Sequence, residues 1–464
     1  MDHSAAGQDL AALERRLAGE VLVPGSAGYE STRKPAHPRF DHIRPQAIAL
    51  CAGSSDVAEV LAFARQSAIP LAVRSGGHCF IGRSSTEGIV LDLTAMHSVS
   101  LGDSTATVGA GTRLGELYDR LDEHRVTLPA GCGSTVGISG LTLGGGIGVF
   151  GRKYGLTCDS LLSARVVLAD SEVVECDNSR NPDLFWALRG GGGNFGVATS
   201  LVFQTSPAAA ATAFRFTWPH FEAEQTLRAW QQWAPDAANE VCGVLRISVS
   251  GDAGEPPVVS MVGVVLGSML QTEDYLAEFL EQCGGQPTHR SLDTVEAGGG
   301  LKRSVAKMDS VVLEGSDSRA VFSKSEFFRR PLTPGAVAAL LRNLSEDRPS
   351  GESRELSFTP MGGRYNDVSP QATAFVHRAE QFLVEHVTTT APDASDSAAR
   401  AALSWAERSW RCVHEQASGG VYPNFPDLDL RDWKMAYYGA NYERLRQIKS
   451  IYDPDGVLNG PQSI

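Results

Sequence analysis

The sequence lacks an excess of positive charge and has no long uninterrupted apolar run. Its formal net charge is −13, from 41 Lys and Arg against 54 Asp and Glu. Nucleic-acid-binding surfaces need a concentrated basic face, so this balance argues against a nucleic-acid partner. The longest apolar stretch, Val258 to Leu270, contains serine and glycine and is too short to span a bilayer. We therefore predict no membrane partner.

The cysteines also lack any regular spacing. There are 8 of them, without a C-x-x-C pair, so neither a disulfide framework nor a zinc site is indicated, and we predict no metal. The start, MDHSAAGQDLAALERRL, carries acids early and lacks the apolar core of a secretory signal. It is typical of an amphipathic helix. Together these absences predict a cytoplasmic protein.

The first part of the chain is organised around glycine-rich loops. Three of them, Arg74–Ser85, Gly131–Gly151 and Asp183–Thr199, are each joined to a segment that reads as a buried strand. Glycine permits close approach of the backbone, and backbone N–H groups can bind phosphate without side-chain charge. The length of 464 residues favours more than one domain, and we predict a cofactor-binding domain over 1–205. The expected strands are Gln46–Cys51, Ile69–Val73, Gly88–Leu93, Ala164–Ala169 and Ser200–Gln204.

The pattern changes after residue 205. Strand-like segments alternate with helical ones, which predicts an α+β domain over 206–419 with helices on one face of a sheet. The segment 420–464 ends in a turn-rich tail that we expect to return to the first domain. The expected strands are Ala213–Trp218, Val244–Ser250, Val258–Leu266 and Glu355–Phe358, and the expected helices Phe221–Trp233, Thr272–Gln282, Thr333–Asn343, Gln371–Val387 and Asp396–Gln416.

One motif suggests a nicotinamide cofactor. GIGVFG, Gly146–Gly151, matches G-x-G-x-x-G, and Asp170 lies about where a ribose-binding acid belongs. The motif should follow a clean strand and open a helix within a βαβ unit. Here the preceding segment is short, and Tyr154-Gly155 interrupts the helix that the motif should open. The context therefore argues against a nicotinamide domain.

The glycine loops taken together resemble a different family. RSGGHCFIG, GISGLTLGGGIG, KYGLTCDSL, LFWALRGGGGNFGVAT and NYERLRQIKSIYDPDGVLNGPQSI occur in the order seen in the berberine-bridge-enzyme-like FAD-linked oxidases. These belong to the vanillyl-alcohol-oxidase/PCMH flavoprotein superfamily. The resemblance is strong over residues 40–205 and 420–464. It implies an α+β fold, in which a PCMH-type FAD-binding domain of two α/β subdomains is joined to a substrate domain with an antiparallel sheet covered by helices.

The resemblance also implies the cofactor and its attachment. In this family the loop that corresponds to Arg74–Ser85 wraps the FAD pyrophosphate, and the histidine, here His78, is joined to the 8α-methyl group of the flavin. Cys79 stands where the family usually has serine. The residues that the resemblance places at FAD are Arg74, Ser75, Gly76, Gly77, His78, Cys79, Gly82, Gly133, Thr135, Gly137, Gly140, Leu143, Gly145, Val197, Tyr422 and Asn424.

Many relatives carry a second link from a cysteine to the flavin. Counted back from the shared Thr135-Val136-Gly137, the bonding position falls on Gly133, and Cys132 is one residue early. Adjacent residues of an extended loop point to opposite sides. We therefore predict a single covalent bond through His78, with a loop slip that restores the Cys132 link as the alternative.

Catalysis needs a base that takes a proton from the substrate. In bacterial relatives a tyrosine of a Y-x-N-Y-like motif has that role, and the matching stretch here is Tyr422-Pro423-Asn424-Phe425. Tyr422 is the predicted base, and a packing role is its alternative. Phe425 replaces the second tyrosine and has no ionisable group, so this enzyme works differently if that tyrosine is the base in relatives. Ser139 is predicted to help position dioxygen at the flavin.

The resemblance implies a bacterial FAD-dependent oxidase of secondary metabolism, including antibiotic biosynthesis. The expected partners are dioxygen and a small-molecule substrate whose oxidised carbon is of the alcohol, hemiacetal or amine type. Hydride passes to flavin N5 and electrons to dioxygen. One alternative is a flavin-dependent oxygenase or oxidative cyclase; another, from a different class, is a flavin-binding protein without turnover. The sequence predicts no oligomeric state.

Overall fold

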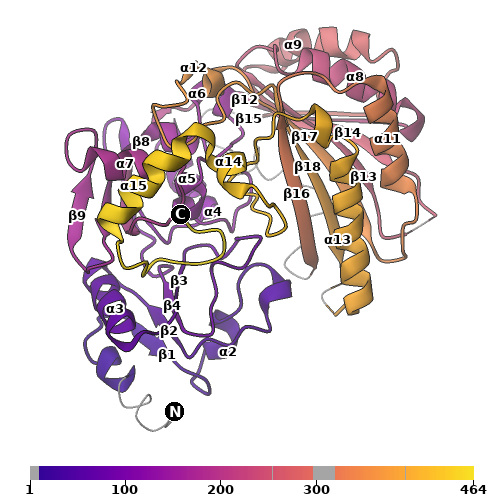
Figure 1. Ribbon diagram of the computed structural model, residues 1–464. Coiled ribbons are helices and arrows are strands. Elements are labelled where there is room, and N and C mark those ends of the chain that lie inside the picture. The colour runs from indigo at the N-terminus through magenta and orange to yellow at the C-terminus, as the bar shows by residue number, and fades with distance from the viewer. Residues whose placement is uncertain (1–9, 253, 296–318, 392) are drawn as a thin grey trace.

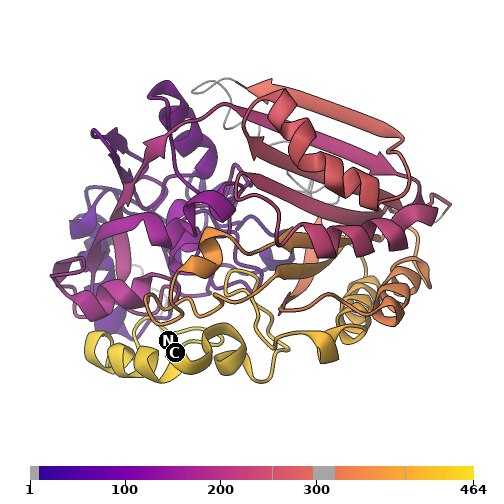
Figure 2. The same ribbon diagram turned by 90° about the horizontal axis from the view of Figure 1, so that it is seen from above.

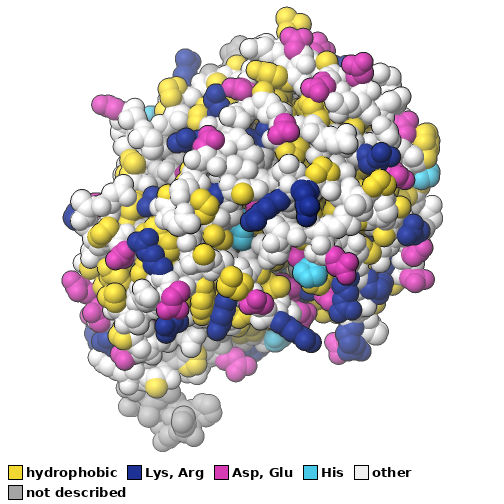
Figure 3. All heavy atoms as spheres, turned by 45° about the horizontal axis from the view of Figure 1, so that its top comes forward, with side chains coloured by type: hydrophobic (Ala, Val, Ile, Leu, Met, Phe, Trp, Pro, Cys, Tyr) yellow, Lys and Arg dark blue, Asp and Glu magenta, His cyan; other side chains and the backbone are white. Residues whose placement is uncertain are grey.

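A computed structural model describes residues 10–252, 254–295, 319–391 and 393–464. The first nine residues, part of the expected helical start, lie outside this set. Figure 1 shows two lobes, with the N-terminal domain on one side and a large sheet with its helices on the other. Within the described residues no helix combines the length and the apolar character needed to cross a membrane. On the face shown in Figure 3, acidic and basic side chains are interspersed.

The first sheet of the N-terminal domain positions the loop that begins at Ser75. Three of its strands are short runs that pair in parallel, and helix α3 (Ser54–Ser67) connects the first of these to the second along the chain. Strand β3 (Leu71–Arg74) ends where the glycine-rich loop starts. In spatial order the strands are β1 (Glu20–Leu22), β2 (Ala47–Leu50), β4 (Ile89–Asp92) and β3 (Leu71–Arg74).

The second sheet of this domain pairs its neighbouring strands in antiparallel fashion. The strands Val99–Leu101 and Thr105–Gly109 form a hairpin around Gly102. In spatial order the strands are β5 (Val99–Leu101), β6 (Thr105–Gly109), β10 (Val197–Gln204), β8 (Leu161–Val167) and β9 (Val173–Cys176). The accompanying elements are α2 (Tyr29–Thr32), η1 (Pro38–Phe40), α4 (Leu114–Glu123), β7 (Val126–Thr127), α5 (Ile138–Leu143), α6 (Gly151–Tyr154), η2 (Thr157–Ser160), α7 (Pro182–Leu188) and β11 (Ser206–Pro207).

The nicotinamide motif has no Rossmann context in the structure. The segment after Gly146 leads into α6, which is only 4 residues long. The carboxylate of Asp170 accepts the backbone N–H of Glu172 within an exposed turn. The structure therefore agrees with the rejection of a nicotinamide domain.

The second lobe is built on a seven-stranded antiparallel sheet. Helices α8 (Ala223–Trp233), α9 (Met269–Gln282), α11 (Pro334–Ser345) and α13 (Asp396–Arg411) cover its outer face (Figure 2). Successive side chains along each strand point to opposite faces of this sheet. The strand order is β15 (His289–Val295), β12 (Ala211–Trp218), β14 (Val258–Leu266), β13 (Val241–Val249), β17 (Ser353–Pro360), β18 (Phe382–Thr390) and β16 (Ala320–Phe328).

Strand β13 shows how this alternation separates the two cores. Leu245 and Ile247 belong to the core under the helices, whereas Cys242 and Val244 pack into the core of the N-terminal domain. The inner face of the sheet therefore meets the glycine-rich loops. This confirms the predicted α+β architecture with an antiparallel sheet covered by helices.

The helix expected over Gln371–Val387 is wrong. The structure has a loop there followed by strand β18. Phe382 and Val384 face the helices, while Leu383 packs beside Tyr422 on the opposite side, so the burial has a period of two residues. The β-branched run at the end of this strand also favours extended structure. Pairing with both neighbouring strands decides the conformation.

The C-terminal segment returns to the N-terminal domain (Figure 1). Its helix α15 (Tyr442–Tyr452) lies against α7, where Arg444 forms an ion pair of 2.6 Å with Asp183. Lys324 of β16 contacts Asp427 of the segment at 2.5 Å. The remaining elements are η3 (His220–Glu222), α12 (Arg364–Asp367), η5 (His414–Gln416), α14 (Trp433–Tyr438) and η6 (Gly439–Asn441).

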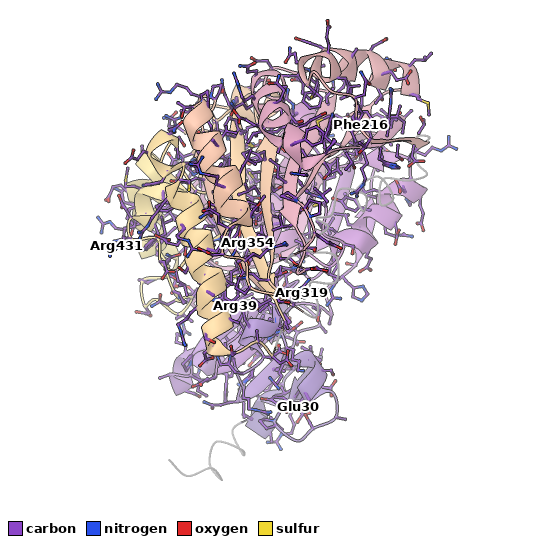
Figure 4. All side chains as sticks on the ribbon, turned by 90° about the vertical axis from the view of Figure 1, so that its right-hand side faces the viewer. Glu30, Arg39, Phe216, Arg319, Arg354 and Arg431 are labelled. Carbon is purple, nitrogen blue, oxygen red and sulfur yellow. The ribbon has the colours of Figure 1, made fainter. Side chains whose placement is uncertain are left out.

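The two lobes also meet at Arg39. Its guanidinium lies 4.7 Å from the ring centre of Phe322 on β16 and 5.0 Å from that of Phe40. Figure 4 places Arg39 where the helix-covered lobe meets the N-terminal domain. This contact joins the helix-covered face of β16 to the N-terminal domain.

Candidate active site

Two glycine-rich loops touch backbone to backbone beneath the large sheet. A Cβ atom on Gly76 would fall on the backbone nitrogen of Gly137, and a Cβ atom on Gly137 would fall on the Ser75 hydroxyl and the Gly76 nitrogen. Only glycine allows the backbones of these two loops to approach this closely. The contact joins the loop after β3 to the loop that leads into α5, so their backbone N–H groups share one site.

His78 stands at the junction of these loops. Its Nε2 atom is joined to the Thr135 hydroxyl by a hydrogen bond of 2.9 Å, and its backbone carbonyl lies 3.2 Å from His37 Nε2. Burial, reinforced by the nearby positive charge of His37 and Arg113, lowers the pKa of His78 to about 4. The imidazole is therefore neutral at physiological pH, with a nitrogen lone pair available for bond formation.

A cavity of about 820 Å³ lies between the loops, the inner face of the sheet and the C-terminal segment. Most residues that the sequence places at the site line this cavity, so the structure brings them together. They are Ser75, Gly76, Gly77, His78, Cys79, Gly133, Thr135, Gly137, Ser139, Gly140, Leu143, Val197, Tyr422 and Asn424. Cys132, next to Gly133, also lines it.

Arg74, Gly82 and Gly145 lie outside the cavity lining. The buried Arg74 guanidinium donates to the carbonyls of Ser84 and Arg33 and holds the loop in place. Gly82 has a φ of +77° and packs on the ring of Phe40, and Gly145 has a φ of +110°. These three residues therefore support the conformation of the loops without lining the cavity.

The cavity fits FAD in size, lining and hydrogen-bonding capacity. Its volume is within the range of small-molecule and cofactor sites. A Cβ atom on Gly140 would meet nothing within 4 Å, so this part of the wall is open to a ligand. The buried Ser84 hydroxyl, also in the lining, has no hydrogen-bond partner in the described part of the chain. Gly192 and Gly193 bring the third glycine-rich loop to the same cavity.

Tyr422 reaches the cavity from the C-terminal segment. Its hydroxyl oxygen accepts hydrogen bonds from the backbone N–H groups of Gly146 at 3.2 Å and Ile147 at 2.9 Å, and from Asn424 Nδ2 at 3.0 Å. Burial raises the pKa of Tyr422 to about 12, while the three donors oppose this rise. The arrangement can stabilise a phenolate once the proton has left.

Ser139 lies on α5 in the cavity wall. Its hydroxyl donates a hydrogen bond of 2.7 Å to the carbonyl of Ala110, and the Ser75 hydroxyl donates to the same carbonyl at 2.8 Å. The Ser139 proton is thus engaged with the backbone, and only its oxygen lone pairs are available to a ligand.

Sequence reasoning missed a polar row on the inner face of the large sheet. Strand register aligns Arg246 of β13, Ser357 of β17 and Glu385 of β18, and all three line the cavity. The signal was present in the segments VLRIS and LVEHV, where a charged residue replaces an apolar one at an inward position. Because β18 was expected to be helical, its alternation could not be used.

Two acids that line the cavity from this sheet, Glu355 and Glu385, have different surroundings. Glu355 forms an ion pair of 3.8 Å with Arg246, and both side chains are buried. Glu385 Oε1 accepts a hydrogen bond of 2.7 Å from Ser323. Burial, with the charge of Glu355 in addition, raises the pKa of Glu385 to about 7, against the opposing effect of Arg246. Glu385 can therefore exchange a proton near neutral pH.

Comparison with known proteins agrees with this geometry. Residues 45–177 match the family described as FAD binding domain, and 421–464 match the family described as Berberine and berberine like. The chain is 32% identical over 457 residues to an uncharacterized FAD-linked oxidoreductase, YvdP, of Bacillus subtilis, covering 97% of this chain and 98% of that protein. It is 29% identical over 441 residues to chitooligosaccharide oxidase of Gibberella zeae, covering 90% and 87%.

The solved structure of BBE-like 1 from Physcomitrella patens has the same fold, with a TM-score of 0.87, 26% identity and 98% of each chain covered. Fold and site together define an FAD-dependent oxidoreductase. The chain belongs to the berberine-bridge-enzyme-like family of FAD-linked oxidoreductases, which confirms the predicted resemblance and PCMH-type fold.

Proposed function

We propose that the protein is an oxidase that removes two electrons from a small-molecule substrate and passes them to dioxygen. The observation that carries this proposal is the shared cavity, in which the flavin-domain loops face the polar row of the large sheet. When bound, FAD supplies the two-electron acceptor that takes hydride from the substrate carbon and is reoxidised by dioxygen. The similarity to chitooligosaccharide oxidase supports dioxygen as the acceptor.

His78 is the proposed point of covalent attachment. Its neutral imidazole lines the cavity, and Thr135 fixes the ring through Nε2. Nδ1 has no hydrogen-bond partner among the described residues, which leaves it available to the 8α-methyl group. The proposal keeps a single link. Cys132 also lines the cavity, so the alternative second link is tested in the same experiment.

Tyr422 is the proposed proton acceptor for the substrate O–H or N–H group. Three hydrogen-bond donors converge on its oxygen and would stabilise the phenolate that forms. Asn424 couples this tyrosine to the flavin loops, because the same Nδ2 atom donates to the Leu141 carbonyl at 2.9 Å. Ser139 is the residue proposed to position dioxygen. The proposal also includes a bacterial secondary metabolite as substrate and a cytoplasmic location.

Acid precipitation of the purified protein, followed by peptide mass analysis, tests the attachment. Flavin should remain on a peptide that contains His78, and the peptide with Cys132 should be unmodified. A colourless pellet under a yellow supernatant would contradict covalent attachment. Stoichiometric hydrogen peroxide during turnover is expected for an oxidase, whereas oxygen-18 in the product would instead indicate the oxygenase alternative.

A further inference from the structure

A short segment after α15 forms one wall of the cavity. Asn459, Gly460 and Ser463 line the cavity, whereas Pro461, in the middle of the same segment, is exposed and does not line it. We call residues 459–463 the strap. In the view of Figure 1 the yellow trace that contains it crosses the front of the N-terminal domain. The strap thus has one side toward the cavity and one toward solvent, so its movement would open the cavity.

The chain just before the strap is firmly anchored. Lys449 Nζ donates to the Leu458 carbonyl at 2.9 Å and to the Asn194 carbonyl at 2.6 Å. The same ammonium group forms an ion pair of 2.6 Å with Asp453, and both charged side chains are buried. Asn194 belongs to the third glycine-rich loop. This anchor therefore fixes the start of the strap beside that loop.

Arg83 latches the strap to the first glycine-rich loop. Its Nε atom donates to the Pro461 carbonyl at 2.8 Å, and its Nη2 atom donates to the Gln462 carbonyl at 3.1 Å. Arg83 lies in the same loop as His78, five residues further along the chain. Hydrogen bonds from a charged donor are stronger than those between neutral groups. Two such bonds hold the strap in place.

Gln462 forms a second latch. Its Nε2 atom donates to the Asp427 carbonyl at 2.7 Å, and its Oε1 atom accepts a hydrogen bond of 3.2 Å from the Tyr437 hydroxyl. The φ of Gln462 is +53°, in the left-handed region that residues other than glycine seldom adopt. The latch contacts offset the cost of this conformation. Gln462 does not line the cavity, so it can hold the strap without touching a ligand.

The strap lies on the cofactor side of the cavity. Arg83 and Lys449 connect it and its anchor to the first and third glycine-rich loops, which supply backbone N–H groups to the proposed FAD site. The polar row of Arg246, Ser357 and Glu385 belongs instead to the large sheet. Movement of the strap would therefore expose the part of the cavity that faces the glycine-rich loops.

We propose that the strap is a gate for the cofactor, which opens to admit FAD and is held closed by the Arg83 and Gln462 latches. This inference rests on the proposed function, because it needs FAD in this cavity. The latch bonds join protein to protein, so weakening them makes opening more frequent whether the cavity is empty or filled. The rates of FAD entry and release should then rise together, with little change in the dissociation constant.

This double effect distinguishes a gate from a simple cofactor contact. Loss of a contact with a ligand acts mainly on the release rate and leaves the entry rate nearly unchanged. Arg83 lines the cavity and could act in either way, so both rates must be measured. Gln462 lies outside the cavity lining, and its substitution weakens the latch alone.

Flavin exchange in a His78→Ala background, which cannot form the predicted covalent bond, tests the gate. Entry is followed by the change in flavin fluorescence after FAD is mixed with flavin-free protein, and release by the reverse change after dilution. Arg83→Met removes both charged donors and should raise both rates about tenfold. Gln462→Ala should also raise both rates, by a smaller factor, because its hydrogen bonds are neutral.

Arg348→Met is the matched control. Arg348 also donates to backbone carbonyls of a separate segment, those of Ser250 and Asp252, but it does not line the cavity. Both rates should stay at the values of the His78→Ala protein. Unchanged rates in Arg83→Met and Gln462→Ala would show that the strap is a fixed wall and would overturn the proposal. Faster release with an unchanged entry rate would overturn it as well.

A second measurement keeps His78 in place. Protein with the wild-type residue at this position is prepared flavin-free from riboflavin-limited cells, and the rate of FAD entry is measured on mixing. Arg83→Met should again raise this rate about tenfold, because entry precedes any covalent step. An unchanged entry rate would contradict the gate. Protein that binds no flavin in either background would instead contradict the proposed function, which separates the two failures.

Discussion

Asn424 donates a hydrogen bond of 3.0 Å to the hydroxyl oxygen of Tyr422, two residues earlier in the chain. The backbone N–H groups of Gly146 and Ile147 donate to the same oxygen. Three converging donors occupy the acceptor side of the phenol, so its own proton is directed elsewhere. This geometry favours the phenolate, whereas burial opposes it, and the balance sets how Tyr422 acts as a base.

Removing the Tyr422 hydroxyl should slow flavin reduction. We expect Tyr422→Phe to reduce the anaerobic rate of reduction about a hundredfold, because general-base catalysis contributes at least this much. Stopped-flow absorbance measures the rate. Since burial raises the pKa of Tyr422 to about 12, the wild-type rate should still rise between pH 7 and pH 9.

Tyr365→Phe is the matched control for this experiment. The Tyr365 hydroxyl also bonds to the glycine-rich loop, donating to the Gly148 carbonyl at 2.8 Å, but it does not line the cavity. Its loss should lower the free energy of unfolding by about 1 kcal/mol and leave flavin reduction unchanged. If Tyr422→Phe reduces flavin at the wild-type rate, Tyr422 is a packing residue.

Substitution of His78 should abolish the covalent link. His78→Ala should release all flavin on acid precipitation, whereas Cys132→Ala should retain it, because we expect the bond through His78 alone. Absorbance of the pellet and supernatant measures the two fractions. Flavin that stays attached in His78→Ala and is lost only when Cys132 is also replaced would establish a second link.

Much of the fold was accessible from the sequence because local patterns and tertiary structure agree in the N-terminal domain. The runs near Ala47 and Ile89 are short, apolar and bounded by turn residues, and both are strands. The prediction of a helix over 371–387 is wrong for a physical reason. The apolar residues of this segment fit either period over a short window, and pairing with two neighbouring strands, which local sequence does not report, makes Phe382–Thr390 a strand.

The candidate site also has one part that the sequence predicts and another that it does not. Glycine positions such as Gly76 and Gly137 stand out in the sequence because only a close approach explains them, and the structure places them in contact. The partnership of Arg246, Ser357 and Glu385 could not be predicted. It depends on the register of three strands that are more than 100 residues apart in the chain at their extremes, and a single sequence contains no information on that register.

A buried ion pair that joins the flavin domain to the middle of the chain should be important for stability. Arg378 donates to both oxygens of Asp159 at 2.8 and 2.7 Å, and the Arg378 side chain is fully buried. Asp159→Asn should lower the free energy of unfolding by about 3–5 kcal/mol, because it leaves a buried charge unpaired. Denaturant unfolding measures this change.

The exposed pair between Asp183 and Arg444 provides the comparison. It also joins two distant segments, but about half of each side chain is in solvent. Asp183→Asn should change the free energy of unfolding by less than about 1 kcal/mol. Equal effects of the two substitutions would show that the buried pair contributes no more than a surface one.

The contact between the two glycine loops predicts a steric effect on cofactor binding. In Gly76→Ala the new methyl group would fall on the backbone of Gly137, so one loop must move. We expect a loss of about 3 kcal/mol in the free energy of unfolding and a reduced flavin content, measured by denaturation and by the flavin-to-protein absorbance ratio. Gly335→Ala in α11, where a methyl group would meet nothing within 4 Å, should be neutral or slightly stabilising. Full flavin content in Gly76→Ala would show that the loops can separate without loss of the cofactor site.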